Sequence, residues 1–443
     1  MFKKLLNSYW IKSGSLTLFN RIAITAFGLL NFFLLVRMLP KNDFGIWIIY
    51  LSILALSESI RNAFIYNPLL RYLNSVDEKR KPQIISASLV LNLLAACIIS
   101  LVFVILAYTI DYLMDAPELR PMFLISILSV FGFTLFAHFN FLQQANLKFF
   151  GTVVSTMIQK GSLFVFILIV FLLKIETSLF DLALAYSLGY ILSSIVAFIF
   201  AREERTFKLS FNKKWLGQLA NYGKYTLGTN ISTMLNKSTR EWFLGGMIGS
   251  SAAAIFSPSV RVTNLYTIPL SAIASIFYPQ MINRVKHEGN SAAKHMYEKS
   301  VGIILIAMIP AVLFIYFMAE YIVVIMAGPG YEESIPILKL MAIIGVFEPF
   351  QRQFGVTLNA IGKAHINFYF ILVSSLIGIV TTYFFIDYYG ILGAAYSTLI
   401  TYALASVVIQ YILYKQIGVN TANIFIYSME VLKKGIKYLI KRK

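Results

Sequence analysis

Long apolar runs alternate along the chain with short polar turns such as MLPKND, MDAPE, AGPGYEES and DYYG. A helix that crosses a bilayer needs about 20 mostly apolar residues, and turns rich in glycine and proline end such helices. The pattern therefore predicts twelve membrane-spanning helices, near 15–39, 44–66, 82–110, 120–141, 150–173, 178–200, 224–248, 252–280, 301–326, 334–358, 366–386 and 390–413.

The composition agrees with an all-α polytopic membrane protein. Of the 443 residues, 58% are hydrophobic and only 13% are charged, whereas a soluble protein has about 25% charged residues. The single cysteine, Cys97, excludes a disulfide within the chain and a cysteine zinc cluster. The sequence has no glycine-rich phosphate loop, His/Cys metal cluster or nucleophile elbow. We therefore expect no catalytic residue, no metal, no cofactor and no enzyme activity.

The basic residues predict how the chain crosses the membrane. The formal net charge is +18, and most Lys and Arg outside the apolar runs lie at the two ends and in every second loop. Cytoplasmic loops carry such an excess, so both termini are predicted to be cytoplasmic. Membrane topology accounts for the positive charge, and no nucleic acid is expected as a partner. The opposite side holds only five basic residues, Arg37, Lys41, Arg120, Lys174 and Lys339.

Short segments in the two halves of the chain match in sequence. Ala185-Tyr186-Ser187 and Ala395-Tyr396-Ser397 match in sequence, as do Asn20 and Asn230 at the same offset. Transporters are often built from such repeats, and six spans per repeat make the repeats parallel. The predicted organisation is an N-terminal lobe, 1–200, a cytoplasmic linker, 201–223, a C-terminal lobe, 224–414, and a basic tail, 415–443. The tail mixes apolar residues with lysines, which predicts an amphipathic helix on the membrane surface or, as an alternative, a partly disordered basic segment.

The stretch NKSTREWF places three charges, Lys237, Arg240 and Glu241, inside an apolar run. A charge near the bilayer centre costs about 2.5–3.5 kcal/mol, so charges there are usually paired or functional. Lys237 and Glu241, like Glu58 and Arg61, have helical spacing that allows pairing, and such pairs could simply hold helices together. Arg21, Arg240 and Arg261 have no evident partner on their own helix. The rigid guanidinium fork suits phosphate, so these arginines favour an anionic ligand.

Polar side chains extend this pattern on the same helices. We predict that substrate is bound by Arg21, Arg61, Asn230, Lys237, Arg240, Arg261 and Asn264, with Glu58 and Glu241 as candidates for ion coupling. The bend-forming Pro258 and Pro269 lie in the same predicted span as Arg261 and would kink it.

Four segments resemble a known family. FNRIAITAFGLLNFFLLVRMLPKNDFGIWIIYLSIL resembles the opening of O-antigen and exopolysaccharide flippases, with a leucine-rich span, an LP-x-x-x-FG turn and an aromatic-rich span. NYGKYTLGTNIS, AGPGYEESIPILKLMA and GKAHINFYFILVSSLIG with YGILGAAYSTLITY are similar to later parts of the same family. The chain thus resembles the Wzx-type polysaccharide transporters of the multidrug/oligosaccharidyl-lipid/polysaccharide exporter superfamily.

The resemblance implies a fold and a task. The fold is MATE-like, with two six-helix lobes around a central cavity and alternating access. The task is to move an undecaprenyl-diphosphate-linked oligosaccharide, an O-antigen, capsule or exopolysaccharide repeat unit, across the bacterial cytoplasmic (inner) membrane. Membrane lipids, the lipid-linked oligosaccharide, and polysaccharide polymerase and ligase machinery would be its partners. Arg21, Arg61, Arg240 and Arg261 occupy the spans whose arginines attract the diphosphate in this family. Many relatives have an aspartate where this chain has Arg240-Glu241, which leaves an ion-coupling role for Glu241 open.

Two other functions remain possible on sequence grounds. A cation-coupled multidrug exporter of the same superfamily would need a carboxylate for ion exchange, and the positive balance of the buried charges counts against it. A membrane-embedded polysaccharide polymerase or glycosyltransferase would need a large extracytoplasmic loop, and the predicted outer loops are short. The sequence identifies neither the sugar repeat nor the coupling ion.

The predicted topology can be tested by cysteine labelling. Cysteines at Lys79 and Lys213 should resist membrane-impermeant thiol reagents in intact cells, because both positions are predicted to face the cytoplasm. A cysteine at Lys174, on the predicted outer side, serves as the control and should react. Rapid labelling at Lys79 or Lys213 in intact cells would contradict the orientation.

Overall fold

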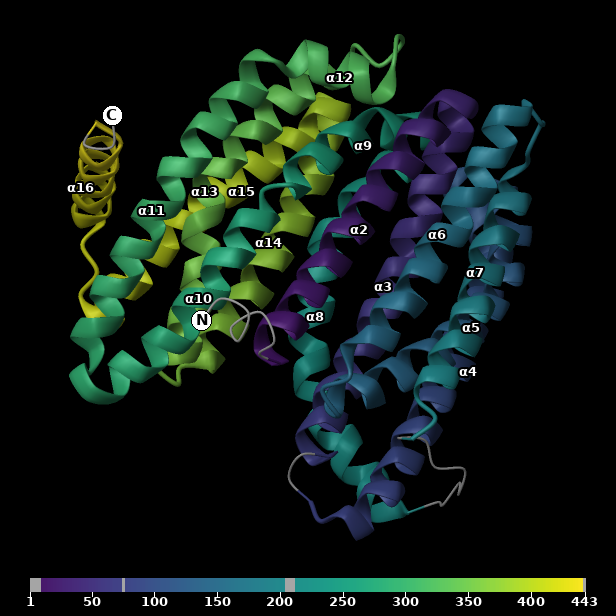
Figure 1. The fold of residues 1–443 in the computed structure, drawn as a ribbon. Coiled ribbons are helices and arrows are strands. Elements are labelled where there is room, and N and C mark those ends of the chain that lie inside the picture. The colour runs from purple at the N-terminus through teal and green to yellow at the C-terminus, as the bar shows by residue number, and fades with distance from the viewer. Residues whose placement is uncertain (1–8, 74–75, 204–211, 441–443) are drawn as a thin grey trace. The chain divides into compact units, whose positions relative to one another are not determined.

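A computed structural model describes residues 9–73, 76–203 and 212–440, and every regular element in these ranges is a helix. Figure 1 shows the order of the helices along the chain. Their bounds are α2 Tyr9–Met38, α3 Lys41–Leu73, the short 3-10 helix η1 Glu78–Arg80, α4 Lys81–Met114, α5 Leu119–Ala145, α6 Phe149–Leu173, α7 Leu179–Phe200, α8 Lys213–Met247, α9 Ser250–Asn264, α10 Thr267–Glu288, α11 Asn290–Phe317, α12 Ala319–Ala327, α13 Ser334–Ala360, α14 Ala364–Tyr389, α15 Ile391–Ile417 and α16 Thr421–Ile440.

The all-helical membrane fold is confirmed, with one qualification on the number of spans. Eleven helical segments of the described chain are long and apolar enough to cross a membrane. The predicted span 224–248 corresponds to the second part of α8, a helix of 35 residues that is not among the eleven. Its many polar residues, including those of NKSTREWF, lower the apolarity on which that criterion depends.

The predicted span 252–280 falls within one apolar segment, Ser250–Glu288. Where the sequence predicted a kink, the chain forms two helices, α9 and α10, with a break between them. Pro269 has no N–H to donate to the carbonyl of Leu265 four residues earlier. The N–H of Ile268 bonds to that carbonyl instead, at 3.1 Å, and the Thr267 hydroxyl bonds to the Asn264 carbonyl at 2.7 Å. These bonds satisfy the carbonyls that the break exposes. The predicted span 301–326 is likewise divided, between α11 and the short α12.

The chain forms two compact units. The N-terminal unit comprises residues 1–234 with 249–251, and the C-terminal unit comprises residues 235–248 with 252–443. The division therefore falls inside α8, later than the predicted linker at 201–223. Residues 204–211 of that linker, and residues 1–8 and 441–443 at the ends, lie outside the described ranges, and the two six-span lobes stay a prediction.

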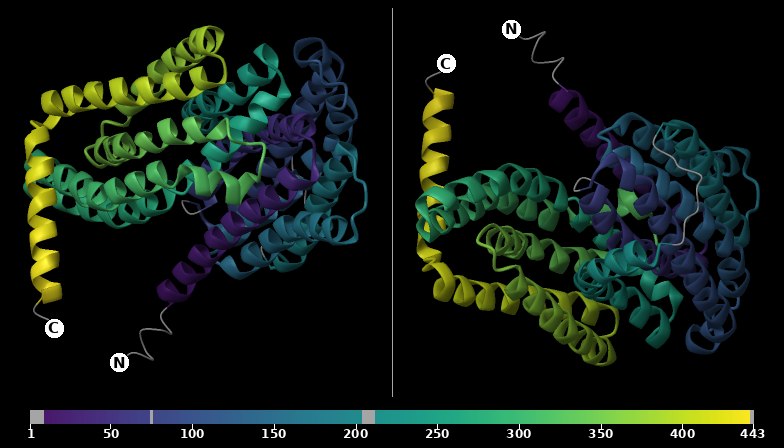
Figure 2. Two further views of the ribbon diagram at one scale, coloured as in Figure 1. Left: turned by 90° about the horizontal axis from the view of Figure 1, so that it is seen from above. Right: turned by 90° about the horizontal axis from the view of Figure 1, so that it is seen from below.

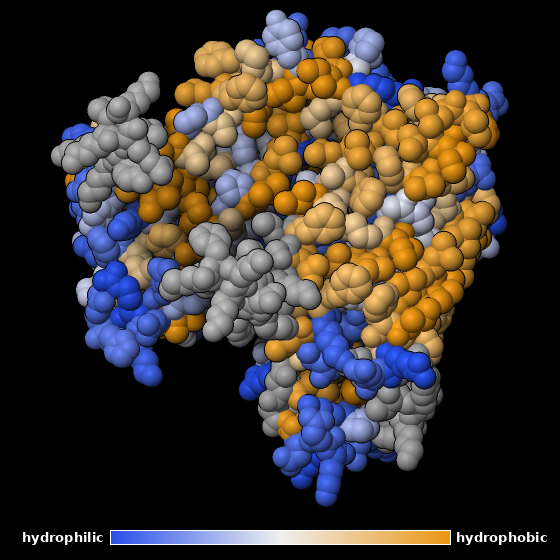
Figure 3. Space-filling view, viewed as in Figure 1, coloured by the Kyte–Doolittle hydropathy of each residue, from blue (hydrophilic) through white to orange (hydrophobic). Residues whose placement is uncertain are grey.

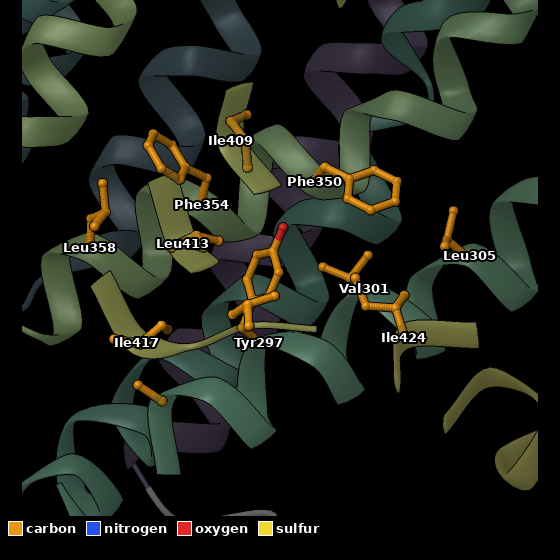
Figure 4. Packing of buried hydrophobic residues seen from close by; sticks show 12 residues of the cluster. Tyr297, Val301, Leu305, Phe350, Phe354, Leu358, Ile409, Leu413, Ile417 and Ile424 are labelled. Atoms are coloured by element: carbon orange, nitrogen blue, oxygen red, sulfur yellow. The ribbon is translucent and has the colours of Figure 1, made fainter. Parts of the chain in front are cut away.

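Each unit has its own hydrophobic core. In the N-terminal unit, Leu69, Ile84, Leu142 and Trp215 belong to a cluster that joins α3, α4, α5, α7 and the start of α8. In the C-terminal unit, Figure 4 shows Tyr297 and Val301 of α11 near Phe350 and Phe354 of α13 and side chains of α15 and α16. A second C-terminal cluster, which includes Leu244, Phe256, Ile337 and Ala395, packs the end of α8 and α9 against α13, α14 and α15.

The exterior of the helices is apolar. Leu101 on α4, Leu172 on α6 and Ile199 on α7 are each at least 60% exposed. Figure 3 shows apolar side chains along the flanks of the helices and hydrophilic ones gathered toward helix ends. Monomeric soluble proteins rarely expose apolar surface on this scale. Together with the eleven apolar segments, this surface makes the chain a multi-pass membrane protein.

Candidate functional site

The charged turn of α8 is held in place by neighbouring helices of the C-terminal unit. Arg240 is only 8% exposed, and its Nη2 donates a hydrogen bond to Oδ1 of Asn236, one helical turn earlier, at 3.0 Å. Asn236 in turn lies against Gly378 of α14, where a Cβ atom would come within 2.7 Å of Nδ2 of Asn236. Gly378 therefore leaves room for the amide that orients Arg240.

A carboxylate on the same turn faces two arginines. Glu241 attracts both Arg240 and Arg261 electrostatically. Arg261 lies in the last turn of α9, just before the break that separates α9 from α10. Packing of α9 against the end of α8 places the two helices that carry these side chains next to each other. Sequence spacing alone did not relate Arg261 to Glu241.

Lys237 has a different counter-charge from the one expected. The attraction it experiences comes from Glu348 of α13, whereas Arg240 and Arg352 repel it. This arrangement replaces the predicted pairing of Lys237 with Glu241. Glu241 attracts the two arginines, and Glu348 attracts Lys237.

Two tyrosines and a further arginine complete the arrangement. Tyr266 and Tyr402 both lie within electrostatic range of Glu348, and Tyr402 also lies within range of Arg240. Nη2 of Arg352 donates to the hydroxyl of Ser271 at 3.3 Å and attracts Glu348. We call the whole set the C-terminal cationic cluster; it comprises Lys237, Arg240, Glu241, Arg261, Tyr266, Glu348, Arg352 and Tyr402.

Glu348, Arg352 and the two tyrosines were not among the predicted site residues. For Glu348 a signal was present in the sequence. It is an acidic residue in an apolar run, and it lies four residues before Arg352, so the two share a helix face. For Tyr266 and Tyr402 no such signal exists, because aromatic residues are 15% of the chain and also line membrane interfaces.

Arg61 of the N-terminal unit is buried and forms several contacts within that unit. It is 2% exposed, and its Nη1 donates to the Val130 carbonyl at 2.7 Å and to the Thr134 hydroxyl at 2.8 Å. Its guanidinium also lies over the ring of Phe133, 4.2 Å from the centroid. These contacts join α3 to α5, so they describe a side chain that holds the unit together.

Glu58 is also bound inside the N-terminal unit. Its Oε1 accepts hydrogen bonds from the hydroxyls of Tyr190 at 2.6 Å and Tyr186 at 2.9 Å, both on α7. Glu58 and Arg61 attract each other, but they do not form one of the ion pairs within 4 Å that the described residues contain. In place of the expected contact within the helix, Arg61 is hydrogen-bonded to α5 and Glu58 to α7.

The remaining predicted residues are distributed over both units. Arg21 is exposed on α2 in the N-terminal unit. Asn230 lies in the part of α8 that belongs to the N-terminal unit, and Asn264 is exposed at the end of α9. Of the predicted site residues, the structure thus brings together Lys237, Arg240, Arg261 and Glu241. No group of three or more His, Cys, Asp or Glu side chains within the described ranges could hold a metal ion.

Sequence comparisons connect the chain to polysaccharide biosynthesis. A family described as polysaccharide biosynthesis protein matches residues 34–336. The lipopolysaccharide biosynthesis protein WzxC of Escherichia coli K12 is 22% identical over 361 residues, which cover 79% of this chain and 69% of that protein. An uncharacterized membrane protein of Methanocaldococcus jannaschii is 22% identical over 418 residues, which cover 84% and 80% of the two chains.

Solved structures show the fold class. The lipid II flippase MurJ in an inward closed conformation has a TM-score of 0.79 at 14% identity, covering 97% of this chain and 93% of that one. An inward-facing multidrug resistance transporter of the MATE family has a TM-score of 0.77 at 14% identity, covering 89% and 94%. The MATE-like fold is therefore confirmed. Both proteins are transporters rather than enzymes, in agreement with the expectation for this chain.

The contrast between Arg61 and Arg21 gives a stability prediction. Arg61→Ala removes two hydrogen bonds from a charged donor, and such bonds contribute about 1.5–3 kcal/mol each. We expect the free energy of unfolding of the purified protein in detergent to fall by about 2 kcal/mol or more. Arg21→Ala is the matched control in the same unit and should change it by less than about 0.5 kcal/mol, because Arg21 is exposed. Equal stability of the two variants would contradict the structural role of Arg61.

Proposed function

The chain belongs to the polysaccharide biosynthesis protein family, and from this premise we propose that it is a flippase for a lipid-linked oligosaccharide. Its substrate would be an undecaprenyl-diphosphate-linked O-antigen, capsule or exopolysaccharide repeat unit. The membrane would be the bacterial cytoplasmic membrane, with both chain termini on the cytoplasmic side. Polysaccharide polymerase and ligase machinery would use the product on the other side.

The C-terminal cationic cluster is the observation that carries this proposal. Cations outnumber carboxylates in it, since Glu241 and Glu348 face Lys237, Arg240, Arg261 and Arg352. A diphosphate offers several acceptor oxygens, and arginine binds phosphate through two parallel N–H donors. A diphosphate-linked lipid is therefore the membrane substrate whose head group such a cluster suits best.

The two carboxylates explain how the cluster exists without substrate. Several unpaired cations close together in a membrane region would repel one another and cost free energy. Glu241 attracts Arg240 and Arg261, and Glu348 attracts Lys237 and Arg352. A diphosphate would take over these cations and weaken their attraction to the carboxylates. Competition of this kind limits the net gain on binding, which a transporter needs because the substrate must also leave.

Predicted site residues outside the C-terminal cationic cluster would act at other steps of transport. Arg21 is an exposed cation of the N-terminal unit, and we assign it to contact with the anionic head group at another stage of alternating access. Asn230 and Asn264 would offer amide groups for the oligosaccharide. Glu58 stays a candidate for ion coupling, with the phenols of Tyr186 and Tyr190 as its partners.

A multidrug exporter is the second candidate, because the fold resembles that of a MATE transporter and the cluster contains two carboxylates. A cationic drug would need Glu241 or Glu348 as its counter-charge. Both carboxylates already attract cationic side chains of the protein. Drug binding would have to displace those side chains into an environment of excess positive charge, which disfavours this function.

The proposal is tested by complementing a bacterial strain that lacks its own flippase and measuring surface polysaccharide. Each of Arg240→Ala and Arg261→Ala removes charged hydrogen-bond donors worth about 1.5–3 kcal/mol each, so we expect transport to fall about ten-fold or more. Arg240→Lys should retain part of the activity, because it keeps the charge but loses the fork. Insertion should persist, since removing a buried charge lowers its cost.

Arg284→Ala is the matched control. Arg284 belongs to the same unit but forms an exposed ion pair with Glu288, 2.7 Å long, on α10, so its loss should leave surface polysaccharide at the wild-type level. Blotting checks that all variants reach equal abundance. Normal polysaccharide from the Arg240→Ala, Arg261→Ala double variant would reject the cationic cluster as the substrate site. Drug resistance without polysaccharide would favour the exporter.

A further inference from the structure

The C-terminal helix α16 docks on α11 through one of its faces. Ile424 belongs to the core of the C-terminal unit, and the hydroxyl of Ser428 donates to the Gly302 carbonyl at 3.1 Å. Gly302 permits this approach, because a Cβ there would lie 2.8 Å from the Ile424 carbonyl oxygen. One turn along, Nδ1 of His295 and the hydroxyl of Tyr427 are 3.1 Å apart.

A buried carboxylate fixes the start of α16. Glu298 of α11 is 1% exposed, and its Oε1 accepts the backbone N–H of Asn420 at 2.7 Å. Its Oε2 accepts Nδ2 of Asn423 at 3.1 Å. The N-terminus of a helix carries partial positive charge, which stabilises a carboxylate at this position. The first turns of α16 are therefore held on α11, and α16 runs across the other helices of its unit in Figure 2.

A second face of α16 is apolar and exposed. Phe425 is 55%, Met429 55% and Leu432 39% exposed. Their spacing of three to four residues places them on one side of the helix, about a quarter of a turn from the docked side that carries Ile424 and Ser428. These three side chains are exposed within the described chain.

Basic residues follow the apolar face in the sequence. Lys433 is exposed and follows the apolar residues. Beyond Ile417 the sequence has one acidic residue, Glu430, and six basic ones, Lys433, Lys434, Lys437, Lys441, Arg442 and Lys443. A helix with an apolar side next to a lysine-rich side is typical of helices that lie in the headgroup region of anionic bilayers.

We propose that α16 is a binding surface for anionic lipid headgroups. Phe425, Met429 and Leu432 enter the boundary between headgroups and acyl chains, and Lys433 binds the phosphates. The bilayer is the occupant that fits, because α11 and α15 next to α16 are themselves long enough and apolar enough to cross it. A second protein chain would not need the basic residues. Through Glu298, this surface would fix the position of α11 relative to the membrane plane.

The proposal can be tested without any measurement of transport. The lipid-binding surface can therefore be rejected while the flippase function stands, and the flippase function can be rejected while the lipid-binding surface stands. Cys97 is the only cysteine of the chain, so Cys97→Ser gives a background for spin labels at Met429→Cys and, as the matched control one residue away, Glu430→Cys. The full-length protein is reconstituted in vesicles of phosphatidylcholine with or without phosphatidylglycerol. Collisions with oxygen and with a water-soluble nickel complex then report the depth of each label.

With phosphatidylglycerol, the label at 429 should lie about 5–10 Å below the headgroups, and the label at 430 should stay accessible to nickel. Without anionic lipid, and in the Lys433→Glu variant, the label at 429 should move toward water. Nickel access at 429 equal to that at 430 in anionic vesicles would overturn the proposal. Equal depth of the label at 429 with and without phosphatidylglycerol would overturn the anionic-lipid assignment. Dipolar coupling between labels of two chains would show that a second copy covers the face instead.

Discussion

A charged side chain in an apolar environment must find a partner, and this constraint organises the polar interior of the protein. Arg61 donates hydrogen bonds to a backbone carbonyl and a hydroxyl and lies over an aromatic ring. Glu58 accepts hydrogen bonds from two phenols. Glu298 accepts hydrogen bonds from the backbone N–H of Asn420 and the side-chain amide of Asn423, at the start of a helix. Each of these groups has neutral partners within one unit, and these contacts stabilise the fold.

In the C-terminal cationic cluster the partners of the charged side chains are themselves charged, so cations and carboxylates attract one another. Glu241 and Glu348 are shared among more cations than they can neutralise. The break between α9 and α10 and the space left by Gly378 are what allow these side chains to converge. Discontinuous helices near charged groups are typical of substrate sites in transporters. The excess positive charge is the property that distinguishes this place from the buried charges elsewhere.

Periodicity and apolarity were sufficient to predict the helices, because a membrane helix is recognised by about 20 apolar residues in a row. The same reasoning gave the charges of NKSTREWF as a candidate site. It did not give the contacts between helices: Glu348 attracts Lys237, and Arg61 donates hydrogen bonds to α5. Pro258 and Pro269 predicted a kink within 252–280, and the chain forms a break between α9 and α10 there, since a proline can either bend a helix or end it. Contacts between distant segments are set by packing, which a local pattern does not contain.

The central claim is that the C-terminal cationic cluster recognises a diphosphate. The most direct measurement is equilibrium binding of a short-chain isoprenyl diphosphate and of the corresponding isoprenyl alcohol to the purified protein in nanodiscs. The account predicts that the diphosphate binds at least about ten-fold more tightly, a difference of about 1.4 kcal/mol, and that this preference disappears when Arg240 and Arg261 are both replaced by alanine. Equal affinity of the wild-type protein for the two lipids, or a preference that survives in the double variant, would contradict it.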